Sequence, residues 1–289
     1  MADPEAGVPF RKGHGTENDF VLLPDPDGAL ELTEPRVRAL CDRRRGLGAD
    51  GVLRVVRGLA LGDPVGARCA EAGAEWFMDY RNADGSLAEM CGNGMRVFAR
   101  YLVEAGLVTG AESTGLLVGT RGGPRQVGFT PEGEVTVDMG PVRLGPRGAA
   151  LVGGRAFEGI AVDVGNPHLA CQVAAELDTL DLSRPPAHDA ALFPHGCNVE
   201  FFTAPDAGEM RMRVHERGVG ETRSCGTGTV AATAAALHGL GRDEGELVVH
   251  VPGGRVLVRL AGGEASLTGP AVVLAEGELR ADWWRSVGH

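Results

Sequence analysis

Short stretches in which apolar and polar residues alternate recur along the chain, separated by glycine or proline. Clear examples are residues 134–139, 210–215 and 255–260. Alternation with a period of two is typical of strands that bury one face. The 45 glycines are spread along the chain without a repeating period, as expected where tight turns join short strands. The pattern predicts a protein built mainly from short strands.

Helical patterns are few, and the two clearest begin directly after a cysteine. Cys91 is followed by Gly-Asn-Gly and an amphipathic run that ends at Gly106. Cys225 is followed by Gly-Thr-Gly and the Ala-rich segment 229–240, which is apolar on every side. An amphipathic helix packs with one face, whereas a helix that is apolar all round is enclosed by protein. We therefore expect a sheet wrapped around one central helix in each half of the chain.

The two cysteine segments also share one order of features: a strand, a polar turn, Cys-Gly-x-Gly, and a helix closed by glycine. Since the cysteines lie nearly half the chain length apart, we expect two related domains. The predicted class is α+β: two pseudo-symmetric domains, each a curled, mostly antiparallel sheet around a central helix, with the active site in the cleft between them. We place the N-terminal domain at residues 1–132, completed by 270–289, and the C-terminal domain at 133–269.

Charge and apolar content exclude several classes of partner. The 289-residue chain has a net charge of −11, which argues against binding to nucleic acid or to an anionic membrane. Its first residues include early acidic side chains and no apolar stretch, so we expect no secretory signal. The longest apolar run, residues 230–237, is far shorter than the about 20 residues of a membrane helix. We expect a cytoplasmic protein.

The six cysteines have neither the C-x-x-C spacing nor the histidine spacing of a zinc site. Cys41 and Cys171 lie in apolar runs, and Cys69 and Cys197 in loop-like or strand-edge sequence, so these four are interpreted as packing residues. No phosphate-binding loop, dinucleotide fingerprint or zincin motif is present. Lys12 lies in a predicted strand and is rejected as a pyridoxal-binding lysine. We expect no cofactor and no metal.

Cysteine at the start of a helix is suited to proton transfer. The first backbone N–H groups of a helix have no partner within it, and the helix dipole adds positive charge there, so a thiolate is favoured. The flanking glycines let backbone amides approach a carboxylate closely. One such site is compatible with a nucleophile, a phosphate loop or a packing cysteine. Two of them supply a base and an acid for opposite faces of one carbon, which inversion of a stereocentre without a cofactor requires.

Seven ordered motifs then identify a family. They are residues 12–20 (KGHGTENDF), 81–85 (RNADG), 90–94 (MCGNG), 165–168 (GNPH), 216–221 (ERGVGE), 224–228 (SCGTG) and 251–254 (VPGG). With these motifs the chain resembles the diaminopimelate epimerases, which interconvert LL- and meso-diaminopimelate without pyridoxal phosphate, in lysine and peptidoglycan precursor biosynthesis. The resemblance covers nearly the whole chain and implies a homodimer.

The resemblance also implies roles for single residues. Cys91 and Cys225 correspond to the thiolate and thiol that exchange the proton, and His168 and Glu216 to the neighbours that adjust their pKa values. The implied substrate-binding residues are Asn18, Asn82, Gly92, Asn93, Asn166, Asn198, Glu216, Arg217, Gly226 and Thr227. Arg217 is expected to hold the distal carboxylate through two hydrogen bonds, and Glu216 to accept an ammonium group.

Two features depart from this pattern or lie outside it. Many family members have glutamine where Gly51 stands, so residue 51 is left out of the predicted site. The segment ending in Asp282-Trp-Trp284 has no predicted role.

Three other functions stay open from the residues. A proline or hydroxyproline racemase uses the same pair of thiols, but has histidine in place of Asn93 and needs no Arg217. A redox protein would use Cys91 and Cys225 as a reversible disulfide and would not turn over amino acids. An anion-binding module would need the glycine loops and leave both cysteines unexplained.

Overall fold

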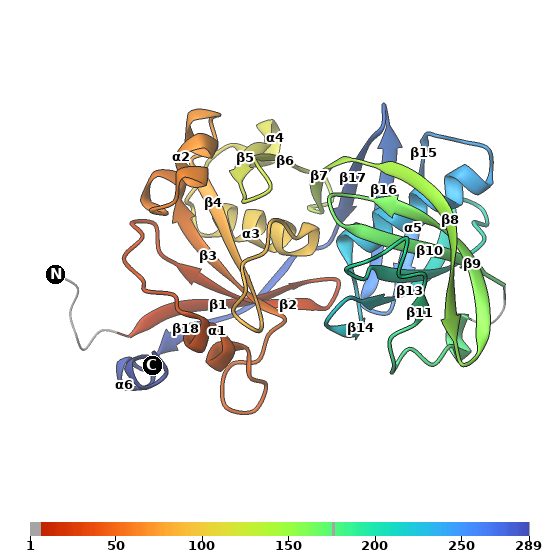
Figure 1. Ribbon diagram of the computed structural model, residues 1–289. Helices are drawn as coiled ribbons and strands as arrows, with labels where there is room; N and C mark the ends of the chain where they lie inside the picture. The colour runs from red at the N-terminus through yellow and green to blue at the C-terminus, as the bar shows by residue number, and fades with distance from the viewer. Residues whose placement is uncertain (1–6, 175–176, 289) are drawn as a thin grey trace. The chain divides into compact units, whose positions relative to one another are not determined.

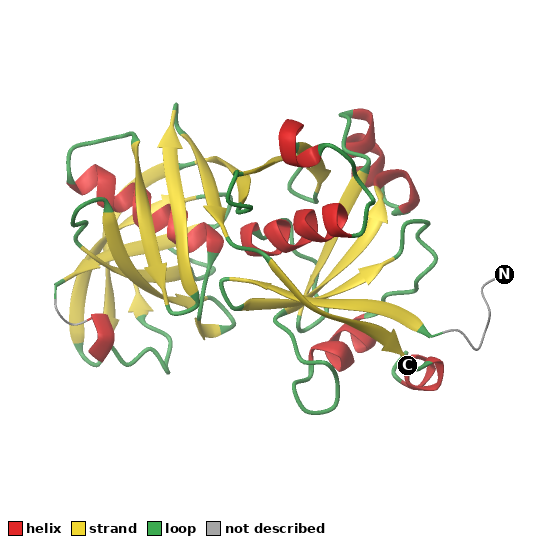
Figure 2. Ribbon diagram, turned by 180° about the vertical axis from the view of Figure 1, so that it is seen from behind, coloured by secondary structure: helices red, strands yellow, loops and turns green. Residues whose placement is uncertain are grey.

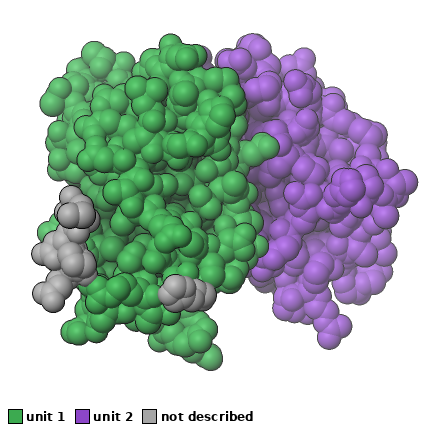
Figure 3. All heavy atoms as spheres, turned by 60° about the vertical axis from the view of Figure 1, so that its left-hand side comes forward, with its two compact units in different colours: residues 1–15, 19–135, 270–289 green, residues 16–18, 136–269 purple. Residues whose placement is uncertain are grey.

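The computed structural model describes residues 7–174 and 177–288 (Figure 1). The chain divides into two compact units, coloured separately in Figure 3. Unit 1 contains the described residues of 1–15, 19–135 and 270–289, and unit 2 contains those of 16–18 and 136–269. Both units combine helices with β-structure, which confirms the predicted α+β class.

The sheet of unit 1 mixes parallel and antiparallel neighbours. Its strands are β1 (Val8–Gly15), β2 (Asn18–Pro24), β3 (Gly51–Arg57), β4 (Trp76–Asn82), β5 (Leu116–Gly119), β6 (Arg125–Phe129) and β18 (Val272–Leu279). The β1–β18, β3–β4 and β5–β6 pairs are antiparallel, whereas β2–β3 and β4–β5 are parallel. Because β18 pairs with β1, the end of the chain completes the sheet that its beginning starts.

The helices of unit 1 are α1 (Glu34–Cys41), α2 (Pro64–Glu71), α3 (Gly92–Glu104), α4 (Ala111–Thr114) and α6 (Ala281–Ser286), with the short 3-10 helix η1 (Gly58–Ala60). Helix α3 packs against β1, β3, β4 and β18, and its first eight residues are buried. Helix α6 carries Trp284, which joins the core that contains Val37 and Leu40 of α1. The guanidinium of Arg36 lies 4.8 Å from the centre of the Trp284 ring.

Unit 2 is richer in strands, most of them antiparallel. They are β7 (Val135–Pro141), β8 (Arg143–Val152), β9 (Arg155–Asp163), β10 (Pro167–Val173), β11 (Ala187–His188), β12 (Asn198–Thr203), β13 (Glu209–Glu216), β14 (Gly220–Thr222), β15 (Gly245–Val251), β16 (Gly254–Ala261) and β17 (Glu264–Gly269). The parallel exceptions are β10–β12 and β13–β15. The 3-10 helix η2 (Leu177–Thr179) lies between β10 and β11.

Helix α5 (Gly226–Gly239) is the central element of unit 2 (Figure 2). It packs against strands β9, β10, β12, β13, β15, β16 and β17, and nearly all of its residues are buried. Alanine has the highest helix propensity and leaves room for strands to approach closely, so an Ala-rich sequence suits a helix enclosed by a sheet.

The structure confirms the three strands predicted from alternation, as β7, β13 and β16. It corrects the interpretation of Cys69, which lies in helix α2 rather than in a loop, although it is buried as a packing residue is. No helix in the described part of the chain combines the length and the apolar character needed to cross a membrane.

Candidate active site

Cys91 is the N-cap of α3. Its backbone is extended, with φ −143° and ψ 116°, and its Sγ accepts a hydrogen bond from the backbone N–H of Gly94 at 3.3 Å. The backbone N–H of Met95 donates to the Cys91 carbonyl oxygen at 2.8 Å, which is the first backbone hydrogen bond of the helix. The N–H groups of Gly92 and Asn93 thus belong to the first turn, where the helix itself offers no acceptor.

A buried arginine fixes the side chain of Asn93. Arg96 is fully buried, and its Nη2 donates to Asn93 Oδ1 at 2.5 Å while Nη1 donates to the Pro270 carbonyl oxygen at 2.8 Å. Burial lowers the pKa of Arg96 to about 10, against the opposing influence of Cys91 and Glu134. A cation is therefore held beneath the start of α3 at neutral pH. The sequence analysis did not identify Arg96; an arginine directly after Met95, next to the apolar stripe of the predicted helix, was the available signal.

Cys225 has the same role at the start of α5. Its backbone angles are φ −127° and ψ 116°, and its Sγ accepts from the backbone N–H of Gly228 at 3.4 Å. Thr227 Oγ1 lies 3.5 Å from the same sulfur, and the Thr229 N–H donates to the Cys225 carbonyl oxygen. The two cysteines thus cap their helices in nearly identical backbone conformations.

Glu216 stands at the end of β13 and interacts with Cys225. It accepts a hydrogen bond from the Thr222 hydroxyl on β14. Burial raises the pKa of Glu216, while hydrogen bonds with Thr222 and Cys225 act in the opposite direction. The Cys225 thiol and the Glu216 carboxylate are thereby joined by a hydrogen bond at the start of α5, and this carboxylate binds a proton more readily than usual.

The surroundings of Cys225 favour the thiol over the thiolate. Burial raises the pKa of Cys225 well above its ordinary value, and the carboxylates of Glu216 and Glu200 add to this effect. The hydrogen bonds from Thr227 and Gly228 oppose it but are weaker. The sequence analysis expected the helix N-terminus to favour the thiolate at both positions; at Cys225, burial and nearby negative charge act in the opposite direction.

Asn166, His168 and Thr227 are linked by hydrogen bonds in unit 2. The His168 Nε2 contacts Asn166 Oδ1 at 2.9 Å, and Asn166 Nδ2 donates to Thr227 Oγ1 at 3.4 Å. The His168 Nδ1 lies 2.7 Å from Oε1 of Glu200, and both of these side chains are fully buried. Glu200, on β12, was missed by the sequence analysis, although a glutamate within the apolar strand Asn198–Thr203 is an unusual choice.

Asn198 and Arg217 are joined through the backbone. The side-chain oxygen of Asn198 accepts from the Arg217 N–H at 2.9 Å. The Arg217 Nη1 donates to the carbonyl oxygen of His195 at 3.0 Å, which holds the exposed side chain along the loop before β12. A guanidinium has five N–H donors, so these contacts leave others for a carboxylate.

Asn18 begins β2, directly after a strained turn. Thr16 and Glu17 have φ values of 51° and 60°, a region that residues other than glycine rarely adopt. The Thr16 hydroxyl lies 2.7 Å from the Ser224 hydroxyl, next to Cys225 in sequence. The turn that precedes Asn18 is thus tied to the segment that precedes Cys225.

Asn82 lies at the end of β4 in unit 1, where its Nδ2 donates to the Ser86 hydroxyl at 3.0 Å. Gly51 pairs with Asn82 across β3 and β4. A Cβ atom at Gly51 would lie 2.6 Å from the Arg81 carbonyl oxygen, so the backbone leaves no room for a side chain there.

No group of three or more His, Cys, Asp or Glu side chains suited to a metal ion occurs within residues 7–174 and 177–288.

Comparisons with known proteins agree on one family. The family profile described as diaminopimelate epimerase matches residues 10–145 and 160–274. The diaminopimelate epimerase of Thermobifida fusca is 59% identical over 273 residues, covering 94% of this chain and 97% of its own. That of Rhodococcus opacus is 57% identical over 289 residues, covering 96% and 99%.

Solved structures show the same fold at low identity. A Bacillus anthracis phenazine biosynthesis protein of the PhzF family has a TM-score of 0.70 at 18% identity, covering 94% of this chain and 98% of its own. A hydroxyproline epimerase from Agrobacterium vitis, with bound trans-4-hydroxy-L-proline, has a TM-score of 0.67 at 15% identity, covering 96% and 93%.

Proposed function

Since the chain belongs to the diaminopimelate epimerase family, we propose that it interconverts LL- and meso-diaminopimelate, with Cys91 and Cys225 as the two acid–base groups. The observation that carries this proposal is the matched pair of cysteine N-caps on α3 and α5, each followed by Gly-x-Gly. The same reaction serves lysine and peptidoglycan precursor biosynthesis in the family.

The chemistry requires removal of a poorly acidic proton next to a carboxylate. One cysteine, as thiolate, takes the proton from the α-carbon and becomes a thiol. The other, as thiol, delivers its proton to the opposite face and becomes a thiolate, so that no proton is gained or lost overall. Backbone N–H groups of Gly92, Asn93, Gly226 and Thr227 are the donors for the negative charge that develops on the substrate carboxylate.

Glu216 and Arg217 differ in what they can offer the substrate. Glu216 contacts Cys225 and, as a carboxylate, is suited to accept the thiol proton or to bind an ammonium group. Arg217 is exposed and held by the His195 carbonyl oxygen, which leaves its planar fork suited to the distal carboxylate. A substrate with a second amino-acid centre matches this pair better than proline does. We propose Asn18, Asn82, Asn93, Asn166 and Asn198 as further substrate-binding residues.

Incorporation of solvent hydrogen tests the mechanism. In heavy water, meso-diaminopimelate formed from the LL isomer should carry deuterium at the inverted centre from the first time points. Cys91→Ala and Cys225→Ala should each lower kcat by at least about 10²–10⁴-fold, the contribution of positioned acid–base groups. Cys69→Ala and Cys171→Ala, which replace buried cysteines outside the site, are the controls.

Early product that keeps the substrate's own hydrogen, or substantial inversion by either of the first two variants, would refute the two-thiol mechanism. Turnover of proline or hydroxyproline in place of diaminopimelate would show that the protein is a proline or hydroxyproline racemase. Reversible loss of the Cys91 and Cys225 thiols, together with a measurable disulfide potential and no turnover, would favour the redox function.

The proposal has consequences for organisation. Unit 1 and unit 2 serve as the two epimerase domains, and the two thiols must reach opposite faces of one carbon. As the family resemblance implies, we propose a homodimer, measurable by light scattering in solution. We also propose a cytoplasmic location, which fractionation of the source cells would test.

A further inference from the structure

Glu200 is a buried carboxylate directly beneath the start of α5. It is fully buried on β12, and its Oε1 would lie 2.9 Å from a Cβ atom at Gly228, in the first turn of the helix. Among the described residues, its Oε2 has no hydrogen-bond partner. Burial of a carboxylate in this manner is costly, and replacement by an apolar side chain is often neutral or stabilising.

The start of α3 shows that such a cap does not need a carboxylate. A Cβ atom at Gly94, which corresponds to Gly228, would meet Leu53 at 3.3 Å and Phe20 at 3.4 Å. Apolar side chains therefore pack against the helix start that follows Cys91, whereas Glu200 packs against the one that follows Cys225. The helix geometry is nearly the same in both cases. Glu200 thus serves something other than the formation of the cap.

The contacts of Glu200 lead to the sulfur of Cys225 through three side chains. They run from Glu200 to His168 (2.7 Å), to Asn166 (2.9 Å), to Thr227 (3.4 Å) and to Cys225 Sγ (3.5 Å). We call these five residues the Glu200 relay.

Each hydrogen bond of the Glu200 relay can be assigned a donor and an acceptor. Both side chains are fully buried, and an uncompensated negative charge there is strongly disfavoured, so Glu200 and His168 hold two protons between them. Either Glu200 is ionised and His168 is an imidazolium that donates from Nδ1, or Glu200 is protonated and donates to Nδ1 of a neutral ring. In both of these states Nε2–H donates to Asn166 Oδ1, so the Asn166 amide donates to Thr227 Oγ1. The Thr227 hydroxyl, having accepted this bond, is free to donate its hydrogen to Cys225 Sγ.

We propose that Glu200 is a positioning residue for the epimerisation: by keeping the Nε2 of His168 protonated, it turns the Thr227 hydroxyl toward the Cys225 sulfur as a donor. The role deepens the proposed function, on which it rests. A donor at the sulfur stabilises the thiolate, which burial at this position disfavours.

Other ionisable groups also face this region. Glu216, on β13, interacts directly with Cys225. The thiols of Cys171 and Cys197 belong to an apolar core with Leu169, Val199 and Phe201, and burial raises the pKa of each to about 12, so neither ionises in the working range. The direct effect of a Glu200 anion on Cys225 is to disfavour the thiolate, opposite in sign to the effect of the relay.

The first test reads the protonation of His168 directly. In protein labelled with ¹⁵N-histidine, the His168 Nε2 of the wild type should carry a proton when the spectrum is recorded at neutral pH. In Glu200→Gln, an amide that can donate or accept allows both neutral tautomers, so a form without a proton on Nε2 should appear. An unprotonated Nε2 in the wild type would overturn the proposal.

The second test reads the ionisation of Cys225 without substrate. The rate of alkylation by iodoacetamide is followed against pH, and the peptide that contains Cys225 is quantified by mass spectrometry. Asn166→Ala, which breaks the relay at a partly exposed position, should raise the alkylation midpoint by about one pH unit, the size expected for one lost hydrogen bond. Glu200→Gln should raise it by a smaller amount and lower kcat more than it changes KM.

Two comparisons separate the relay from a merely structural role. Glu209→Gln breaks another carboxylate–histidine contact in unit 2, the exposed Glu209–His250 pair at 2.8 Å, and should leave the Cys225 midpoint unchanged. In a Thr227→Val background, Glu200→Gln should no longer raise the midpoint, because the donor is already lost and only the opposite, direct effect of the carboxylate remains.

An unchanged or lowered midpoint in Asn166→Ala, or a rise caused by Glu200→Gln that persists without the Thr227 hydroxyl, would overturn the relay. If Glu200→Gln does not fold, Asn166→Ala and the wild-type ¹⁵N measurement still decide the question. Both readouts are independent of turnover, so failure of the wild type to epimerise diaminopimelate would refute the proposed function without changing their outcome.

Discussion

The Cys91 and Cys225 side chains occupy the same backbone position but differ in the charges around them. A buried guanidinium, Arg96, interacts with Cys91, whereas two carboxylates, Glu200 and Glu216, raise the pKa of Cys225. A cation stabilises a nearby thiolate and an anion destabilises it. The two helix starts are thus equivalent in geometry and unequal in electrostatics.

Arg217→Lys should lower kcat/KM for diaminopimelate by about 10–100-fold, since an ammonium cannot replace the two parallel hydrogen bonds of a guanidinium to a carboxylate. Steady-state kinetics with the LL isomer measure this. The control is Arg211→Lys on β13, the strand that ends just before Arg217; the Arg211 guanidinium binds Asp178 at the surface, and this variant should retain the wild-type constant. Equal constants for Arg217→Lys and the wild type would remove Arg217 from the site.

Helices α3 and α5 place their cysteines through different kinds of packing. Strands surround α5, and its alanines allow the close approach that this needs, whereas α3 presents larger side chains such as Phe98 and Leu102. In both, the sulfur accepts from the third residue of the helix, so the sulfur is fixed by the helix itself. The position of each thiol therefore depends on the packing of one helix within its own unit.

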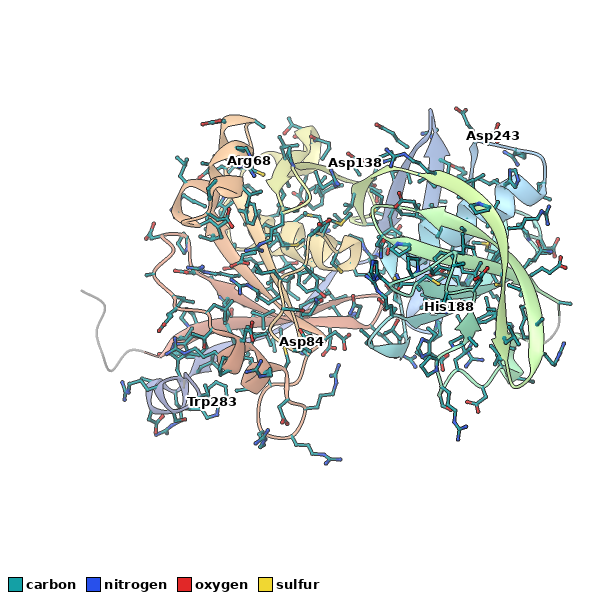
Figure 4. The ribbon with its side chains drawn as sticks, viewed as in Figure 1. Arg68, Asp84, Asp138, His188, Asp243 and Trp283 are labelled. Atoms are coloured by element: carbon teal, nitrogen blue, oxygen red, sulfur yellow. The ribbon has the colours of Figure 1, made fainter. Side chains whose placement is uncertain are left out.

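Helix α6 gives the Trp-Trp segment a structural role that the sequence did not reveal. Trp284 is 8% exposed and packs in the core of unit 1, while Trp283, labelled in Figure 4, is only partly buried. Trp284→Ala should destabilise the protein by about 2–4 kcal/mol through the cavity it leaves and the lost contact with Arg36. Chemical denaturation measures the change, and Trp283→Ala should cost clearly less. Equal effects of the two substitutions would contradict this packing.

Acid stability of the molecule depends in part on Asp19, which joins the first strands of unit 1 to the loop after α1. Burial opposes ionisation, but hydrogen bonds from Arg43 and Lys12 outweigh it and lower the pKa of Asp19 to about 2. A lowered pKa in the folded state gives stability that is present above the ordinary value of 3.8 and is lost as pH falls toward 2.

Asp19→Asn should therefore lower the stability at pH 7 by about 1 kcal/mol, allowing for screening by solvent. The difference from the wild type should shrink between about pH 4 and pH 2, as thermal unfolding across that range would show. Asp27→Asn is the control, because its exposed carboxylate contacts Arg57 at the surface, 3.3 Å away, and is not a partner of Asp19. A difference that stays constant down to pH 2 would contradict the assignment.

The sequence alone determined the class of fold, the strands with clear alternation and the two helices that follow Cys91 and Cys225. These properties are local: period-two patterning and a capping cysteine followed by glycines act over a few residues. The motifs also identified the family, with most of the candidate site residues.

Only the tertiary structure revealed Arg96 beneath Asn93, Glu200 beneath Gly228, and the raised pKa of Cys225. Each of these depends on which side chains from distant strands become buried beside a helix terminus, and no local pattern encodes that. Glu200 and His168 are separated in sequence but lie on adjacent parallel strands, β12 and β10, and the pairing of those strands brings their side chains together. The strength of an electrostatic interaction is set by burial and distance, so the chemistry of the Cys225 thiol was decided by packing.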